Sequence, residues 1–258
     1  MATPREINRH MKSVGNIGKI TKAMKMVAAA RLRRAQEKAA ASRPYAIKIK
    51  EVLSNVVSDP SVLAGLDAKK HPLLQKREVQ KVGYLVLCSD KGLAGAYSSN
   101  ALKMAVAEIS ECEDEVVVIT CGRKARDFFT RRGFNVIQSH IGFSDRPTYE
   151  NAVDIAQDAI KTFASEGFDK LNIVYTVFKT ALSQIPTSEV ILPVEPPVKE
   201  EGKAQASFMF EPGEDDTLTV LAPKYLETVV YAALVQSAAS ELGSRMTAMS
   251  SATDNAAK

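Results

Sequence analysis

The chain has 258 residues, of which 45% are apolar and 25% are charged, a balance typical of a globular protein that folds in water. Its three cysteines are odd in number and lack the spacing of a metal site, which argues against a disulfide framework. No apolar run approaches the roughly 18 residues that a membrane span needs, so we expect no membrane-embedded segment.

The net charge of +4 is unevenly distributed. Residues 1–57 contain 13 Lys or Arg against three Glu, a net of +10, so the remainder carries 4 − 10 = −6. A basic first segment on a near-neutral body predicts an acidic partner for that segment. Nucleic acid and an acidic protein surface both fit this charge.

The first segment, residues 1–57, is predicted to be one long helix. Thr3 to Glu6 has the pattern of a capping box, with Pro4 at the first helical position. An apolar stripe then recurs in steps of three or four, a narrow seam typical of a coiled coil. Its members are Ile7, Met11, Val14, Ile17, Ile20, Met24 and Val27. Such a helix would be roughly 80 Å long, and Pro44 is expected to kink it.

The central segment, residues 58–214, alternates apolar strand-like runs with helix-like runs. We expect strands at 82–88, 115–121, 134–139 and 171–179, and helices at 94–112, 123–132 and 148–165. This order predicts a mostly parallel sheet with helices on its faces, an α/β domain. Two further strands, 190–194 and 206–210, are expected to be antiparallel.

The last segment, residues 215–258, is again predicted to be helical, capped by Asp215 or Asp216. A nearly heptad row rich in small residues follows it: Val230, Leu234, Ser237, Glu241, Ser244 and Ala248. No Gly or Pro stop signal follows, so we expect the natural helix to continue beyond Lys258. Because neither terminal helix can bury its seam alone, we expect the two to pair as an antiparallel coiled coil that projects from the central domain.

Three segments together resemble one known family. The segment ITKAMKMVAAA at 20–30, within 7–36, the segment SDKGLAGAY at 89–97 and the segment SRMTAMSSATDNA at 244–256 resemble gamma subunits of bacterial F-type ATP synthases. The three matches occur in the family's order and span nearly the whole chain. The resemblance implies a coiled-coil shaft made of both termini and a Rossmann-like α/β foot.

The resemblance also implies a function. Gamma subunits are non-catalytic rotor shafts that couple proton-driven rotation to ATP synthesis or hydrolysis in a ring of alpha and beta subunits. The implied partners are alpha, beta, the epsilon subunit and the membrane c-ring, with no nucleic acid, cofactor or metal. The implied location is the cytoplasmic side of the cell inner membrane, as a peripheral protein.

Candidate interface residues follow from the same resemblance. Those implied to meet the catalytic ring are Lys19, Lys22, Met24, Lys25 and Arg245, with a solvated surface position as the alternative for Arg245. Those implied to contact the membrane ring are Phe208, Phe210 and Glu211, with a core position as the alternative for both Phe. The turn that contains Gly92 and Gly95 is implied to lie near the epsilon subunit.

Two other functions are weighed against the rotor. The turn from Gly92 to Tyr97 lies where a phosphate loop would be, but it lacks both G-x-G-x-x-G and Gly-Lys-Ser/Thr. We therefore expect a structural turn in which Gly provides unusual backbone angles. The first alternative is a basic coiled-coil adaptor or nucleic-acid-binding protein, which salt-dependent DNA binding would reveal. The second is an enzyme with a nucleotide site in the α/β domain, which nucleotide binding would reveal.

Overall fold

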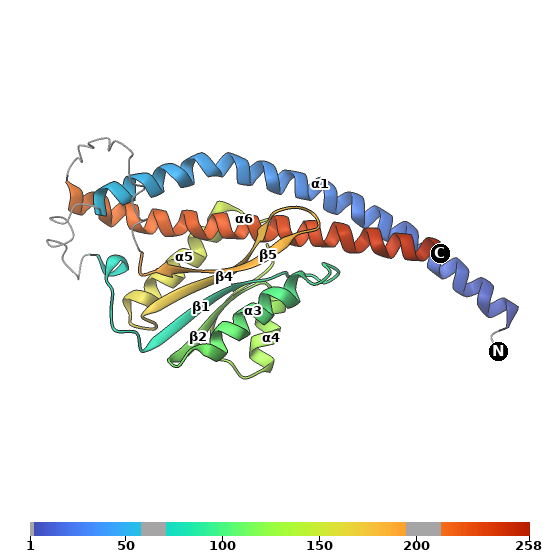
Figure 1. Ribbon diagram of the computed structural model, residues 1–258, viewed down its shortest axis with the longest axis horizontal. Coiled ribbons are helices and arrows are strands. Elements are labelled where there is room, and N and C mark those ends of the chain that lie inside the picture. Colours follow the sequence, from blue (N-terminus) through green and yellow to red (C-terminus); the bar gives the residue numbers. More distant parts are fainter. Residues whose placement is uncertain (1–2, 58–70, 195–212) are drawn as a thin grey trace.

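The computed structural model describes residues 3–57, 71–194 and 213–258, which form a five-stranded sheet and two long terminal helices (Figure 1). Helix α1 (Pro4–Val57) and helix α6 (Glu214–Ala257) lie side by side along the sheet, and α1 extends beyond the end of α6. The predicted α/β fold with long helices at both termini is confirmed. The division at residues 57 and 214 stays a prediction.

Helix α1 begins as its sequence predicts. The Thr3 N–H donates to Glu6 Oε2 at 2.8 Å, and the Glu6 N–H donates to Thr3 Oγ1 at 3.4 Å, which forms the capping box. Pro44 lies inside the helix without ending it, although its ring removes one backbone hydrogen bond. Figure 1 shows α1 as one gently curved rod.

The sheet has the strand order β3-β2-β1-β4-β5. Its strands are β1 (Lys81–Leu87), β2 (Glu115–Cys121), β3 (Val136–His140), β4 (Lys170–Phe178) and β5 (Gln184–Leu192). Strands β1 to β4 are parallel to one another, and β5 is antiparallel to β4. The connecting helices are α3 (Tyr97–Glu111), α4 (Arg123–Arg131) and α5 (Tyr149–Ala164), with a 3₁₀ turn, η1 (Pro72–Leu74), before β1.

The boundary of β5 differs from the prediction. The strand begins at Gln184, six residues before the expected start at 190, and forms a hairpin with β4. Pro186 argued against a strand here, because proline cannot donate a hydrogen bond to a neighbouring strand. Strand β5 is at the edge of the sheet, where a proline is tolerated. The other expected strand, 206–210, lies outside the described residues.

Helices cover both faces of the sheet. Helices α5 and α6 pack on one face, around Leu85, Ile119 and Ile173. Helices α3 and α4 pack on the other, around Val86 and Val118. Because both faces are covered, β1 is buried along nearly its whole length, as parallel strands usually are.

Helix α6 lies between the sheet and α1 and is buried on both sides. The Thr176 N–H donates to Ser237 Oγ at 3.3 Å, Ser240 Oγ donates to the Thr176 carbonyl at 3.0 Å, and Ser244 Oγ donates to Gln184 Oε1 at 3.2 Å. The small-residue row predicted to face the other terminal helix therefore faces strands β4 and β5 along this stretch. Small side chains allow α6 to approach the sheet closely, which the sequence pattern could not distinguish from approach to a helix.

The apolar composition of α6 has a further consequence. Within the described part of the chain it is the one helix, from Asp216 to Ala257, that is long and apolar enough to cross a membrane by composition, which the sequence analysis did not predict. Half of its most apolar window is buried inside the protein. Its burial between α1 and the sheet accounts for this composition.

Helices α1 and α6 pair in antiparallel fashion, as predicted. Thr21 Oγ1 and Thr253 Oγ1 are 2.7 Å apart, and Lys25 Nζ donates to Ser250 Oγ at 2.9 Å. Further along, Leu32 packs against Ala239 and Leu242. Residue numbers rise on one helix as they fall on the other.

The predicted seam of α1 is wrong by about one position. The side chain of Ala28 is 2% exposed, with Thr21 and Leu32 also buried, whereas Ile20 is 59% exposed, and Ile17 and Val27 are exposed as well. The helices approach so closely that a Cβ on Gly18 would lie 3.3 Å from Ala256 Cβ. Small residues are therefore turned inward, and the branched residues of the predicted stripe form an exposed apolar face.

Candidate functional site at the junction of shaft and central domain

The sequence-predicted shaft residues lie together on α1. Lys19, Lys22 and Lys25 are exposed, and Met24 is half-buried. The exposed apolar side chains of Ile17 and Ile20 are near them in the sequence. This part of α1 thus presents cations together with apolar groups, a surface suited to an acidic protein partner.

In the turn after β1, only one of the two predicted glycines has the unusual backbone angle expected of it. Gly95 has φ +54° and Leu93 has φ +61°, so both occupy the left-handed region. Gly92 does not have a positive φ, and a Cβ there would meet nothing within 4 Å, so its predicted backbone role is wrong. A Cβ on Gly95 would lie 3.7 Å from Ser244 Oγ, so this turn packs against α6.

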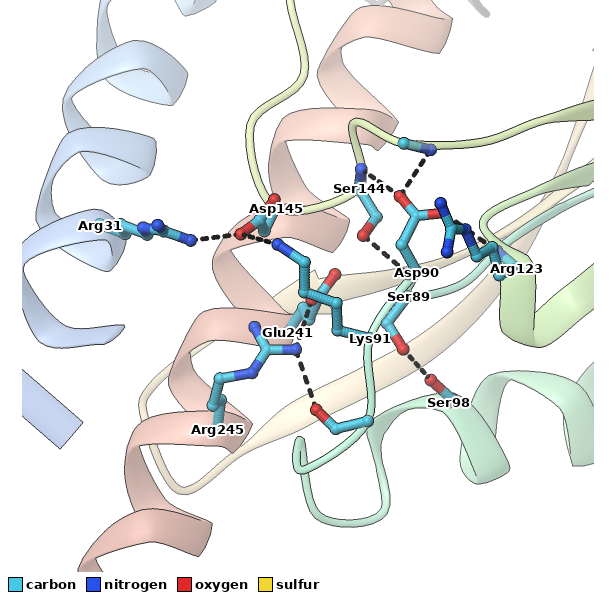
Figure 2. A network of polar contacts seen from close by, with 12 residues as sticks. Arg31, Ser89, Asp90, Lys91, Ser98, Arg123, Ser144, Asp145, Glu241 and Arg245 are labelled. Atoms are coloured by element: carbon cyan, nitrogen blue, oxygen red, sulfur yellow. Dashed lines mark hydrogen bonds and ion pairs between the residues drawn. The ribbon is translucent and has the colours of Figure 1, made fainter. Parts of the chain in front are cut away.

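Arg245 of α6 meets this turn. Its Nη2 donates to the Gly92 carbonyl at 3.3 Å and to Glu241 Oε1 at 2.6 Å (Figure 2). Arg245 is 8% exposed, so the solvated alternative is wrong. Its expected contact with the catalytic ring stays a prediction. The structure thus brings together two sequence-predicted sites, Arg245 and the Gly92 turn, within one chain.

Glu241 is the buried partner of Arg245. It is 0% exposed, and its Oε2 has no hydrogen-bond partner among the described residues. Burial raises the pKa of Glu241, while Arg245 and the Ser144 hydroxyl act in the opposite direction. Sequence reasoning gave Glu241 a place in a helical row but missed this ion pair. The available signal was the Glu–Arg spacing of four residues, which brings two side chains together on a helix.

Asp90 joins the carboxyl ends of three strands. Its carboxylate accepts from the backbone N–H of Arg123 at 3.1 Å, of Gly142 at 2.9 Å and of Ser144 at 3.0 Å. The Asp90 N–H in turn donates to Ser144 Oγ at 2.9 Å. Burial opposes ionisation, but these donors lower the pKa of Asp90 below its ordinary value. Asp90 was not among the predicted site residues.

Asp145 connects α1 to the central domain. It lies in the loop between β3 and α5 and forms ion pairs with Arg31 of α1 and with Lys91 Nζ, the latter at 3.5 Å (Figure 2). Nearby, Lys38 Nζ donates to the Pro147 carbonyl at 3.4 Å. Sequence reasoning missed Asp145, since 114 residues separate it from Arg31. We call this set of charged residues the junction: Arg31, Asp90, Lys91, Asp145, Glu241 and Arg245.

A basic groove lies beside the junction, between α3 and α4. Its volume is about 670 Å³, and Leu102 and Phe128 contribute apolar surface. The cations that line it are Lys91, Lys103, Lys124, Arg131 and Arg132, and no carboxylate of the described residues lines it. Like the exposed face of α1, this groove suits an acidic partner. Phe208, Phe210 and Glu211, the residues predicted to contact a membrane ring, lie outside the described residues.

These features define a class of protein: a two-helix shaft fixed to an α/β domain, with basic and apolar surfaces for partners in a larger assembly. Within the described ranges, no three His, Cys, Asp or Glu side chains are grouped as metal ligands. A family model described as ATP synthase matches residues 3–258. The chain is 46% identical to the ATP synthase gamma chain of Brevibacillus brevis over 98% of its own length and 86% of that protein. It therefore belongs to the ATP synthase gamma chain family.

Other relatives agree with this assignment. The gamma chain of Desulfitobacterium hafniense is 43% identical over 99% of this chain and 88% of that protein. A chain from the central stalk and c-ring of the Tetrahymena thermophila mitochondrial ATP synthase has the same fold, with a TM-score of 0.66 and 23% identity, covering 93% of this chain and 100% of that one. The predicted resemblance to gamma subunits is confirmed. The prediction that the chain is a non-catalytic subunit of ATP synthase is confirmed as well.

Proposed function

We propose that this chain is the central rotor shaft of an F-type ATP synthase and couples proton-driven rotation to ATP synthesis or hydrolysis at sites on other subunits. The observation that carries the proposal is the antiparallel pair of α1 and α6, held at Thr21 and Thr253, in a chain whose relatives are gamma chains. One end of the helix pair extends past the sheet (Figure 1), and this end could enter a ring while the α/β domain stays outside it.

The proposed partners of the shaft are the alpha and beta subunits. Lys19, Lys22 and Lys25 would face acidic loops of beta, and the exposed apolar face at Ile17 and Ile20 would slide past the ring. Because the shaft is asymmetric, each of three chemically equal catalytic sites would meet a different side of it. Rotation would then carry each site through binding, chemistry and release as a rigid-body coupling.

The proposed partners of the central domain are the epsilon subunit and the membrane c-ring. One solved relative comes from a central stalk with its c-ring, and another from the rotor of the Euglena gracilis enzyme, which has a TM-score of 0.59. By this analogy Phe208, Phe210 and Glu211 would contact the ring, and the turn at Gly92 and Gly95 would lie near epsilon. The chain would be a peripheral protein on the cytoplasmic side of the cell inner membrane.

Reconstitution tests this function. The chain is combined with alpha and beta subunits from a bacterial relative, and ATP hydrolysis is measured with and without it. We expect the isolated chain to hydrolyse no ATP, and the complex to show rotation of a bead attached to the central domain. Hydrolysis by the rigorously purified chain, or failure to assemble combined with salt-dependent DNA binding, would overturn the proposal and favour one of the two alternatives.

A further inference from the structure

The junction contains more buried charge than a helix pair resting on a sheet requires. Asp145 and Glu241 have side chains that are 11% and 1% exposed, and each faces a cation. Burying charges is costly unless they are paired, and apolar residues of similar volume often stabilise a protein at least as well. Stability alone is therefore a weak reason for this arrangement, and a role in fixing one geometry is the stronger one.

The ion pairs connect three elements that are distant in the sequence. Asp145 lies on the loop between β3 and α5, Arg31 on α1, and Lys91 on the loop between β1 and α3. One carboxylate thus holds a helix and a loop that are distant in sequence. Arg245 extends the connection, because it holds the carbonyl of Gly92, next to Lys91, from α6.

The side chains in Figure 2 lie where the three structural units meet: α1 on one side, α6 in the middle and the carboxyl ends of the strands on the other. Asp90 makes the strand ends themselves rigid through its three backbone donors. The strand ends thus have their own connection through Asp90, and we expect a change in Asp145 or Arg31 to act between α1 and the domain rather than within the sheet.

We propose that Asp145 is a positioning residue that clamps α1 to the central domain, so that the shaft and the domain turn as one body. Asp145 acts through its ion pairs with Arg31 and Lys91. Glu241 holds Arg245, which connects α6 to the loop that contains Lys91. The geometry of the clamp stands by itself, whereas its consequence for coupling rests on the proposed rotor function. A rotor transmits torque without loss only where its parts do not twist against each other.

The clamp is tested first in the isolated full-length chain. Spin labels are attached at Ala30 on α1 and Lys161 on α5, both exposed, in a Cys112→Ser background, and the distribution of distances between them is measured. We expect Asp145→Asn and Arg31→Gln each to broaden the distribution, with Arg31→Lys close to the parent chain. The double variant should resemble Asp145→Asn, because that variant already removes the pair that Arg31→Gln removes. An unchanged distribution in both variants would overturn the proposal.

The matched control is Arg33→Gln. Arg33 is also on α1, two residues from Arg31, but its pair with Glu37 is on the surface, with 83% of the Arg33 side chain exposed. It should leave the distance distribution unchanged. Broadening by this variant equal to that of Arg31→Gln would mean that any loss of charge on α1 loosens the helix, and would contradict the clamp.

The consequence is tested in the assembled enzyme in vesicles. The ratio of ATP-driven proton pumping to ATP hydrolysis is measured, and we expect it to fall about twofold or more in Asp145→Asn and Arg31→Gln but not in Arg33→Gln. Should Asp145→Asn fail to fold, Arg31→Gln and its Lys rescue decide the matter alone. A broadened distance distribution with an unchanged ratio would refute the role in coupling, whereas failure of even the parent chain to assemble would count against the rotor function and not the clamp.

Discussion

The hydroxyl oxygens of Thr21 and Thr253 are 2.7 Å apart although 232 residues separate them in the chain. Thr21 Oγ1 also lies 3.1 Å from the Gly18 carbonyl, and Thr253 Oγ1 lies 2.8 Å from the Met249 carbonyl. Because each hydroxyl has one hydrogen, one of the two donates across the pair and the other donates to the carbonyl of its own helix. This contact fixes the register of the two helices at the far end of the shaft.

Enlarging the seam should separate the helices. Ala28 is buried against α6, whereas Ala30, two residues away, is exposed. We expect Ala28→Leu to destabilise the chain by about 1–3 kcal/mol through overpacking, and Ala30→Leu to change stability by less than about 0.5 kcal/mol. Urea unfolding followed by circular dichroism measures both. Equal effects would mean that the seam does not lie where Ala28 is.

Gly122 should tolerate no side chain. Its φ is +96°, and a Cβ there would lie 2.3 Å from the carbonyl oxygen of Cys88. We expect Gly122→Ala to destabilise the chain by more than about 2 kcal/mol, from strain and from displacement of a backbone group that cannot yield. Gly15→Ala is the control: that position is helical with open space around it, so about 0.5–1 kcal/mol of stabilisation is expected. Thermal unfolding of both variants distinguishes the two cases.

Asp90 should contribute stability that depends on pH. Asn at this position would lose the charge that three backbone donors face, so Asp90→Asn should cost about 2 kcal/mol at pH 7. Because the folded pKa of Asp90 is lowered, the contribution is present above the ordinary value of 3.8 and is lost as the pH falls through the folded pKa. The difference between parent and variant should therefore shrink below about pH 4. Asp127→Asn, on the surface of α4, should show a smaller dependence, because solvent screens the pair with Arg126 that lowers the pKa of Asp127.

The cysteines should differ in reactivity. Cys88 and Cys121 are buried and Cys112 is half-buried. Burial raises the pKa of Cys88 to about 12 and also raises that of Cys121, so neither forms thiolate near pH 8. We expect a thiol reagent at pH 8 to label one cysteine in the folded chain and three in guanidinium. Rapid labelling of Cys88 in the folded state would contradict the structure.

The same burial predicts an alkaline limit. The Cys88 thiol is kept protonated in the folded state, while in the unfolded state it ionises near its ordinary value of 9.0. The stability that it contributes is therefore present below pH 9 and is lost as the pH rises toward 12. Cys88→Ala should weaken the decline of stability above pH 9, which unfolding curves at pH 8 and pH 10 would measure.

An additional cation at Met24 should impair the coupling of ATP hydrolysis to proton pumping. Met24 is half-buried beside the exposed Lys25, and Met24→Lys would add attraction to acidic loops of the proposed beta partner, on the order of 1 kcal/mol or more if partly desolvated. We expect an assembled complex that hydrolyses ATP but pumps fewer protons per ATP. Met26→Lys, at a side chain that is 61% exposed, should have a smaller effect. Unchanged pumping in Met24→Lys would contradict this assignment.

The sequence by itself determined the secondary structure and the family. The capping box at Thr3, the alternation of strands and helices and the long helical runs at both ends are local patterns, and local patterns are what a sequence displays. Three recognisable segments then identified gamma subunits before any geometry was available. The hairpin that starts β5 at Gln184 was missed because Pro186 is a strand breaker everywhere except at a sheet edge.

The tertiary structure alone decided which faces are buried and which charges meet. Ala28 rather than Ile20 faces α6, because two helices this close can accommodate only small side chains between them, and apolar periodicity does not measure the distance of approach. Asp145 became a candidate residue only when the fold brought it to Arg31, 114 residues away. In the sequence, a carboxylate in a loop cannot be distinguished from any solvated carboxylate. Its burial beside a cation of another element arises only when the whole chain is folded.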